Sequence, residues 1–435
     1  MVRQIRIYLD NPIATYYGGD TVTGKVIVKV DDEEKIRYIS AKFRGDANVS
    51  WTESDSETDS DGKSRTVYTT YSAHENYLMT KMYLVGGPSQ EIILPPGEHI
   101  YNFSVILPEN LPSSFEGING NIRYMVRAKM NRVWAFDDTV KAFFTVLSHL
   151  DLNKDPLVKE PVTTVAEKTL CCCCCRSGPL TLVGNVPAVG FVSGQEIPVT
   201  VEVDNGTNET ISIVTCSLKK NVCFTAHSPS TRTNKTSEKV ETITFEPVGE
   251  NESKTWTKQL KIPSLPPSTL KNCGIIDLEY CLDIKAEISG PHTNLHVNIP
   301  VTLGTIPLFT YIPPGLLQNT PEKLPLPPTA SAPYPPPQSQ FPTAPYPANT
   351  AADITSGTSQ LGFSNVLLPL PSQSNLTPSA PPLPYPDIPP PSYEECMYGA
   401  SNVNVGDNAS HTEEGYNHVP RYPTYNLRPG EATRM

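Results

Sequence analysis

Alternation between apolar and polar residues, repeated in six stretches of the first 312 residues, is the feature that most limits how this chain can fold. Successive side chains of a strand point to opposite faces, so a period of two residues predicts strands with one buried and one solvated face. The stretches with this pattern are 22–30, 101–107, 122–130, 197–203, 276–285 and 295–301. Because no segment shows a convincing helical period, we expect an all-β structure.

Clusters of glycine, proline and asparagine separate these stretches and are typical of turns, as at 17–20 and 95–97. Antiparallel strands with one polar face pack as pairs of sheets, and one such sandwich takes roughly 100–150 residues. We therefore predict two β-sandwich domains, at residues 1–149 and 178–312. Residues 150–177, which include a run of cysteines, are predicted as an interdomain linker.

Proline sets the last part of the chain apart, because 26 of the 45 prolines lie at 313–435. Aliphatic residues are few in this part, apart from short leucine clusters. Such a segment buries too little apolar area to offset the entropy lost on ordering. We predict a disordered tail with local polyproline II conformation that carries short linear motifs.

Charge and hydropathy limit the classes of partner and the cellular compartment that we expect for this chain. The net charge is -11 and no block of basic residues is present, so nucleic acid is not expected as a partner. The first residues lack the apolar segment of a signal peptide, and no stretch reaches the roughly 18 apolar residues of a membrane span. We expect a protein of the cytosol.

Motifs of catalysis and cofactor binding are absent from the sequence. It contains no G-x-S-x-G, H-E-x-x-H, Walker loop or G-x-G-x-x-G, and its eight histidines are scattered. The cysteines do not form the two C-x₂-C pairs of a structural zinc site. We expect no enzyme activity, no small-molecule substrate, no cofactor and no bound metal.

Five of the ten cysteines are consecutive: Cys171, Cys172, Cys173, Cys174 and Cys175. A reducing cytosol argues against disulfides. One interpretation is S-acylation on a cytosolic surface. A second is metal binding, although adjacent residues wrap a tetrahedral ion poorly. The third is the start of a strand, in which alternate cysteines pack as small apolar side chains.

A PPxY peptide, Pro390-Pro391-Ser392-Tyr393, lies in the tail. Polyproline II has three residues per turn, so the first proline and the tyrosine lie on one edge. WW domains bind such an edge in an aromatic groove. We predict that Pro390, Pro391 and Tyr393 make these contacts and that Ser392 faces solvent. One match is weak evidence by itself, and a proline-rich linker is the alternative.

A degenerate version of this peptide, Val419-Pro420-Arg421-Tyr422, has valine in place of the first proline. We interpret Val419, Pro420 and Tyr422 as a possible second WW-binding site. The alternative is a tail segment without a binding role.

Two P(S/T)AP peptides also occur in the tail. They resemble the ligands of the UEV domain of the ESCRT-I sorting complex, since alanine followed by an extended proline suits a narrow groove. The alternative is a linker biased toward proline, alanine and threonine. The candidate UEV-binding residues are Pro342, Thr343, Ala344, Pro345, Pro378, Ser379, Ala380 and Pro381.

Several longer stretches resemble the arrestin-domain-containing, or α-arrestin, family. LPSSFEGINGNIRYMVRAKMNRVWAF (111–136) looks like the characteristic segment of its N-domain, and YYGGDTVTGKVIVKV (16–30) like an early strand pair. EKTLCCCCCRSGPLTL resembles the cysteine-rich entry to its C-domain. IPSLPPSTLKNCGIIDLEYCLDIKAEI and NIPVTLGTIPL resemble its last strands. The similarity covers about residues 1–312.

This resemblance implies two sandwiches of seven or eight strands each, hinged at 150–178. It also implies an adaptor that bridges the cytosolic regions of membrane proteins to HECT-type ubiquitin ligases through WW domains, and possibly to ESCRT-I. Such an adaptor is expected in the cytoplasm, with recruitment to the plasma membrane, endosomes and vesicles.

Two other functions compete with this one. A retromer-type trafficking scaffold shares the double sandwich, but the PPxY-containing tail argues against it. A signalling arrestin that desensitises phosphorylated receptors would need basic residues for phosphate sensing in the first domain. Arg3, Arg6 and Lys25 are present there, but their position alone does not establish that role.

Overall fold

The computed structural model describes residues 3–58, 64–172, 175–309, 391–395 and 419–425. Within these ranges the chain is built almost entirely from β-strands, and its helical segments are two 3-10 turns, η1 (Leu152–Lys154) and η2 (Pro156–Lys159). This architecture confirms the predicted all-β fold class with two sandwiches. The candidate UEV peptides, Pro390 and the two cysteines Cys173 and Cys174 lie outside the described residues.

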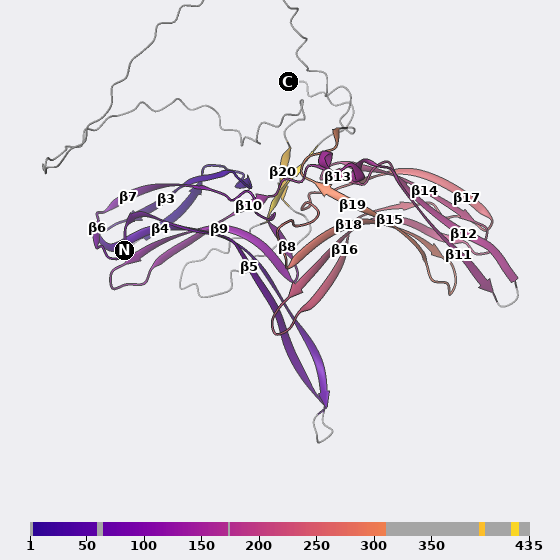
Figure 1. Cartoon of the computed structure of the whole chain (residues 1–435), viewed down its shortest axis with the longest axis horizontal. Helices are drawn as coiled ribbons and strands as arrows, with labels where there is room; N and C mark the ends of the chain where they lie inside the picture. The colour runs from indigo at the N-terminus through magenta and orange to yellow at the C-terminus, as the bar shows by residue number, and fades with distance from the viewer. Residues whose placement is uncertain (1–2, 59–63, 173–174, 310–390, 396–418, 426–435) are drawn as a thin grey trace, which may run out of the picture. The chain divides into compact units, whose positions relative to one another are not determined.

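The first sandwich packs a three-stranded sheet against a seven-stranded one (Figure 1). The smaller sheet has the order β1-β3-β7, and the larger one β2-β10-β9-β4-β5, with β6 beside β4 and β8 beside β9. The strands are β1 (Arg3–Leu9), β2 (Thr15–Tyr17), β3 (Thr21–Val30), β4 (Glu34–Thr58), β5 (Ser64–Gly86), β6 (Ile92–Leu94), β7 (Gly97–Ile106), β8 (Phe115–Gly117), β9 (Gly120–Arg132) and β10 (Asp138–Leu147).

The second sandwich has a four-stranded sheet, β11-β12-β14-β17, and a five-stranded sheet, β13-β19-β18-β15-β16. Its strands are β11 (Val162–Cys172), β12 (Cys175–Val186), β13 (Gly190–Val192), β14 (Glu196–Asn205), β15 (Ile211–Ala226), β16 (Arg232–Phe245), β17 (Glu252–Lys261), β18 (Ile276–Ile288) and β19 (Leu295–Gly304). Each sandwich closes one edge with a short parallel pair, β2 with β10 and β13 with β19.

The alternating pattern sets which face of each strand is buried. In β3, Val22, Val26, Val28 and Val30 are buried, and the intervening side chains are more exposed. A shift of register by one residue would expose these valines, each of which contributes about 1.5–3 kcal/mol by burial. The same alternation fixes the inner faces of β14 and β18.

Strand β11 occupies residues that the sequence suggested as a linker. It pairs with β12 from Val162↔Val186 to Cys172↔Cys175, so Cys172 and Cys175 lie at the end of this strand pair. β11 is an edge strand, and it carries threonine, glutamate and lysine between its apolar residues. Edge strands tolerate such polar residues, because only one side pairs with the sheet, and this composition explains why the segment resembles a linker.

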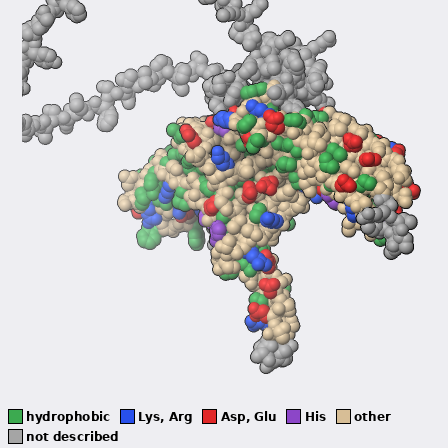
Figure 2. Space-filling model, turned by 45° about the vertical axis from the view of Figure 1, so that its right-hand side comes forward, with side chains coloured by type: hydrophobic (Ala, Val, Ile, Leu, Met, Phe, Trp, Pro, Cys, Tyr) green, Lys and Arg blue, Asp and Glu red, His purple; other side chains and the backbone are tan. Residues whose placement is uncertain are grey.

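Strands β4 and β5 form one long hairpin that continues beyond the neighbouring strands of the sheet. Their pairing runs from Tyr38↔Gly86 to Thr58↔Ser64. Figure 2 shows acidic and basic side chains along this hairpin. They include the exposed pair Arg65 and Glu57, whose charged groups are 3.1 Å apart.

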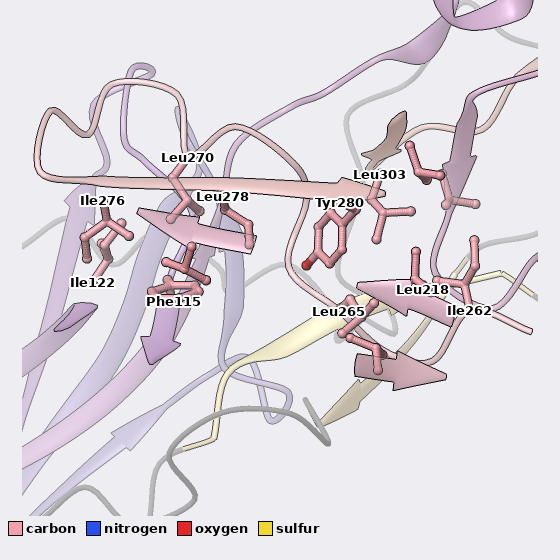
Figure 3. Close-up of a cluster of buried hydrophobic side chains, with 14 of the residues drawn as sticks. Phe115, Ile122, Leu218, Ile262, Leu265, Leu270, Ile276, Leu278, Tyr280 and Leu303 are labelled. Carbon is pink, nitrogen blue, oxygen red and sulfur yellow. The ribbon is translucent and has the colours of Figure 1, made fainter. Parts of the chain in front are cut away.

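The two sandwiches meet over a shared apolar cluster. Phe115 and Ile122 of the first sandwich lie beside Ile276 of the second (Figure 3). The ring of Phe115 is also 6.4 Å from that of Phe224, measured between centroids. Polar contacts join the same faces, because Ser72 exchanges backbone hydrogen bonds with residues 227 and 228.

Two tail segments complete the described structure. β20 (Ser392–Glu395) and β21 (Arg421–Thr424) form an antiparallel pair with the register Ser392↔Thr424 to Glu395↔Arg421. Figure 1 shows the yellow β20 between β10 and β13. These segments differ from the expectation of a tail that is disordered throughout. The buried side chains of Tyr422 and Tyr425 supply apolar area that the proline-rich composition of the tail does not predict.

Candidate functional site

The tail pair contacts both sandwiches at residues that we call the tail-docking site. In the first sandwich the site comprises Tyr17, Ser114, Thr145 and Leu147, and in the second it comprises Ser193, Ser264 and Thr305. All seven residues are buried.

Equivalent loops of the two sandwiches form the walls of this site. In the first, the buried Tyr124 of β9 donates a hydrogen bond of 2.7 Å to the carbonyl oxygen of Pro112. In the second, Tyr280 of β18 donates one of 2.9 Å to the carbonyl oxygen of Pro266. Each bond anchors a proline-containing loop to the core, so Ser114 and Ser264 are held in fixed positions.

The end of β2 supplies the floor of the site. β2 pairs in parallel with β10, which places Tyr17 beside Leu147. The carboxylate of Asp20 accepts a hydrogen bond of 2.7 Å from the Tyr17 amide, and the Tyr17 ring stacks on His149 with centroids 4.4 Å apart. These contacts fix the ring that the tail tyrosines touch.

Tyr422 is the most deeply buried side chain of the tail, with 1% of its surface exposed. It packs with Tyr17 and Leu147, and its hydroxyl donates a hydrogen bond of 2.9 Å to the carbonyl oxygen of Ser114. The amide of Arg421 also donates to the hydroxyl of Thr145, at 3.2 Å. Tyr422 therefore packs in a small apolar cluster with Tyr17 and Leu147 of the first sandwich.

Tyr425 makes the corresponding contacts with the second sandwich. Its hydroxyl donates to the carbonyl oxygen of Thr305 at 2.7 Å, and its amide donates to that of Ser193 at 2.9 Å. Burial raises the pKa of its hydroxyl above the ordinary value. A side chain at Gly194 would lie 2.6 Å from the Tyr425 carbonyl oxygen, so the tail backbone approaches a position that only glycine accommodates.

Tyr393 of the PPxY peptide is half-buried against Tyr17, Leu147 and Tyr422. A side-chain hydrogen bond joins the hydroxyls of Tyr17 and Tyr393, and burial raises the pKa values of both. Glu394, the next residue, also contacts the site, since its carbonyl oxygen accepts a hydrogen bond of 2.9 Å from the hydroxyl of Ser264.

The structure brings the two candidate WW-binding peptides together. Glu394 pairs with Tyr422, and the tyrosines of both motifs contact one cluster. Ser392 is exposed and its hydroxyl lies 2.8 Å from that of Thr424. Val419 is half-buried and Pro420 is buried. The WW contacts of Pro390, Pro391 and Tyr393, and of the second peptide, remain predictions.

Sequence reasoning missed Tyr425, Thr424 and the residues of the sandwiches that contact them. A signal was present in the sequence RYPTY (421–425), where two tyrosines and a threonine stand within five residues. Such residues favour strands.

Other sequence predictions fall outside this site. Cys171 and Cys172 end β11 and Cys175 begins β12, and S-acylation of the run remains a prediction. Arg6 and Lys25 lie on one face of β1 and β3, away from the tail-docking site. Within the described ranges no three His, Cys, Asp or Glu residues are grouped to hold a metal ion. Among the residues that the structure describes, no helix has the length and hydropathy of a membrane span.

The order of strands and the two sandwiches in series define a scaffold of the arrestin type. Residues 5–153 match the family described as arrestin (or S-antigen), N-terminal domain, and residues 176–308 match the corresponding C-terminal domain. The chain therefore belongs to the arrestin domain-containing, or α-arrestin, family.

Curated relatives support this membership. Arrestin domain-containing protein 4 of Homo sapiens is 30% identical over 69% of this chain and 71% of its own length. Arrestin domain-containing protein 17 of Caenorhabditis elegans is 27% identical over 97% of this chain and 98% of its own length. Arrestin domain-containing protein 1 of Homo sapiens is 26% identical over 70% of this chain and 65% of its own length.

Proposed function

We propose that this chain is a non-catalytic trafficking adaptor that links membrane-protein cargo to HECT-type ubiquitin ligases with WW domains. Family membership supports an arrestin-type adaptor role. The observation that carries the finer proposal is a PPxY peptide in the tail of such a protein. Cargo that is ubiquitylated through this link would be directed to endocytosis and sorting.

The chemistry of the peptide supports this proposal. Its consecutive prolines favour the extended polyproline II backbone that a WW groove accepts, and Ser392, Glu394 and Glu395 are exposed. A preformed extended backbone loses little entropy on binding. A peptide this short buries little area, so we expect a Kd in the micromolar range, or about -8 kcal/mol.

Cargo and sorting partners follow from the rest of the chain. The sandwiches would bind cytosolic regions of membrane proteins, and the P(S/T)AP peptides would recruit ESCRT-I through its UEV subunit. We therefore propose that the protein works in the cytoplasm and is recruited to the plasma membrane, endosomes and vesicles.

Binding of a synthetic peptide with the sequence of residues 387–396 to an array of WW domains tests the ligase link. We expect micromolar binding by several domains, loss of binding with Tyr393→Ala, and retained binding with Ser392→Ala, because the serine faces away from the groove. If no domain binds the unmodified peptide, or if Tyr393→Ala binds as well as the original, the proposed ligase link is wrong.

A further inference from the structure

We propose that the tail-docking site is a peptide-binding site whose ligand is this chain's own tail, residues 391–395 and 421–425, and that its occupancy withholds Tyr393 from WW domains. The docking itself is a contact seen between described residues, and its effect on WW domains rests on the proposed function.

The contacts are those of a peptide–receptor interface. Ser114, Thr145, Ser193, Ser264 and Thr305 each form one hydrogen bond with the tail, at 2.7–3.2 Å. Three of these five bonds are made by the second sandwich and two by the first. The tail therefore connects the two sandwiches, in addition to their shared apolar cluster and the backbone hydrogen bonds of Ser72.

The site selects an extended peptide with two unmodified tyrosines separated by two residues. Both hydroxyls, of Tyr422 and Tyr425, donate to backbone carbonyl oxygens. A phosphate has no hydrogen to donate at neutral pH and would place its negative charge against these oxygens. The tail-docking site thus recognises tyrosine and disfavours phosphotyrosine.

Docking and WW binding compete for the same ring. A WW domain takes the motif tyrosine into an apolar pocket, whereas here the ring of Tyr393 packs against Tyr17 and Leu147. One ring cannot occupy both pockets. The apparent Kd for a WW domain therefore rises in inverse proportion to the fraction of molecules whose tail is undocked.

The test compares full-length protein with the peptide of residues 387–396, using the WW domain that binds the peptide most tightly. Tyr425→Ala loosens docking without changing either WW-binding peptide. Ser264→Ala removes the hydrogen bond that the tail-docking site donates to the carbonyl oxygen of Glu394. Tyr68→Ala is the matched control, because Tyr68 is 73% exposed and lies on β5, outside the tail-docking site.

We expect the wild-type protein to bind the WW domain at least about tenfold more weakly than the peptide does, since only the undocked fraction binds. Tyr425→Ala should recover most of the affinity that the wild-type protein lacks relative to the peptide. Ser264→Ala should recover part of it, and Tyr68→Ala none. Equal affinity of the peptide and the wild-type protein would overturn the inference and leave the proposed ligase link intact.

Hydrogen exchange of the full-length protein tests docking without any WW domain. We expect slow exchange of the Arg421 and Tyr425 amides, which donate to the sandwiches, and fast exchange at both in Tyr425→Ala. Fast exchange at these amides in the wild-type protein would refute docking. Failure of the peptide to bind any WW domain would instead remove the proposed function, with slow exchange still supporting the docked tail.

Discussion

Tyr17, at the end of β2, packs against Tyr393, the residue predicted to enter a WW domain, and their hydroxyls share a hydrogen bond. The first residue belongs to the sandwich and the second to the tail. Because the rings of Tyr17 and Tyr393 pack in one cluster with Leu147 and Tyr422, the described part of the PPxY peptide contacts the first sandwich directly. The following predictions depend on this relationship or on the motifs around it.

Tyr422→Phe should lower the free energy of unfolding by about 1–2 kcal/mol. The change removes the hydrogen bond to the Ser114 carbonyl oxygen and leaves that buried oxygen without it. Tyr422→Ala should cost more, about 3–5 kcal/mol, since it also leaves a cavity. Denaturant unfolding of the full-length protein measures both. If the two variants are as stable as wild type, the tail does not contribute to the fold.

Alkaline pH should release the tail. Burial raises the pKa values of Tyr17, Tyr393 and Tyr425 above the ordinary tyrosine value. A raised folded-state pKa means that the neutral form is the one stabilised, so this stability is complete below the unfolded pKa of about 10 and is lost as the pH rises through the folded values.

Unfolding free energies between pH 8 and 11 measure this loss. We expect a decline that begins near pH 10 and that is shallower in Tyr425→Phe, which has one fewer buried phenol. Absorbance of tyrosinate provides a second readout, because ionisation of the buried phenols should coincide with unfolding. An identical decline in Tyr425→Phe and wild type would contradict this assignment.

Phosphorylation of Tyr393 should abolish WW binding. A charge of nearly two units cannot enter an apolar pocket without a partner. The peptide of residues 387–396 with phosphotyrosine should lose all measurable affinity for the WW array, and the same peptide with phosphoserine at Ser392 should lose much less. Retained binding by the phosphotyrosine peptide would show that the ring does not enter the groove.

The two P(S/T)AP peptides should act together. Replacing Pro342 and Pro345 by alanine, or Pro378 and Pro381, should weaken recruitment of ESCRT-I modestly. Replacing all four should abolish it, because two sites on one tail raise the local concentration without new contacts. Capture of ESCRT-I from cells by the purified variants measures this effect. Undiminished capture by the fourfold variant would exclude both peptides.

Local sequence patterns predict the class of fold and suggest candidate partners. Period-two alternation in strands such as β3 and β14 identifies which side chains are buried, since that period is a local property of the extended chain. The PPxY and P(S/T)AP peptides are equally local, because WW and UEV domains recognise a few consecutive residues. Both features can be recognised without knowing what else the chain contacts.

Only the tertiary structure shows the features that depend on residues far apart in the chain, such as the pairing of β11 and the burial of Tyr422. Strand β11 resembles a linker in composition and becomes a strand because β12 provides its hydrogen bonds. Tyr422 is buried because the carbonyl oxygen of Ser114, 308 residues away in the chain, accepts its hydrogen bond and Leu147 packs against its ring. Such burial depends on the complementarity of two surfaces, which neither periodicity nor the composition of a short segment encodes.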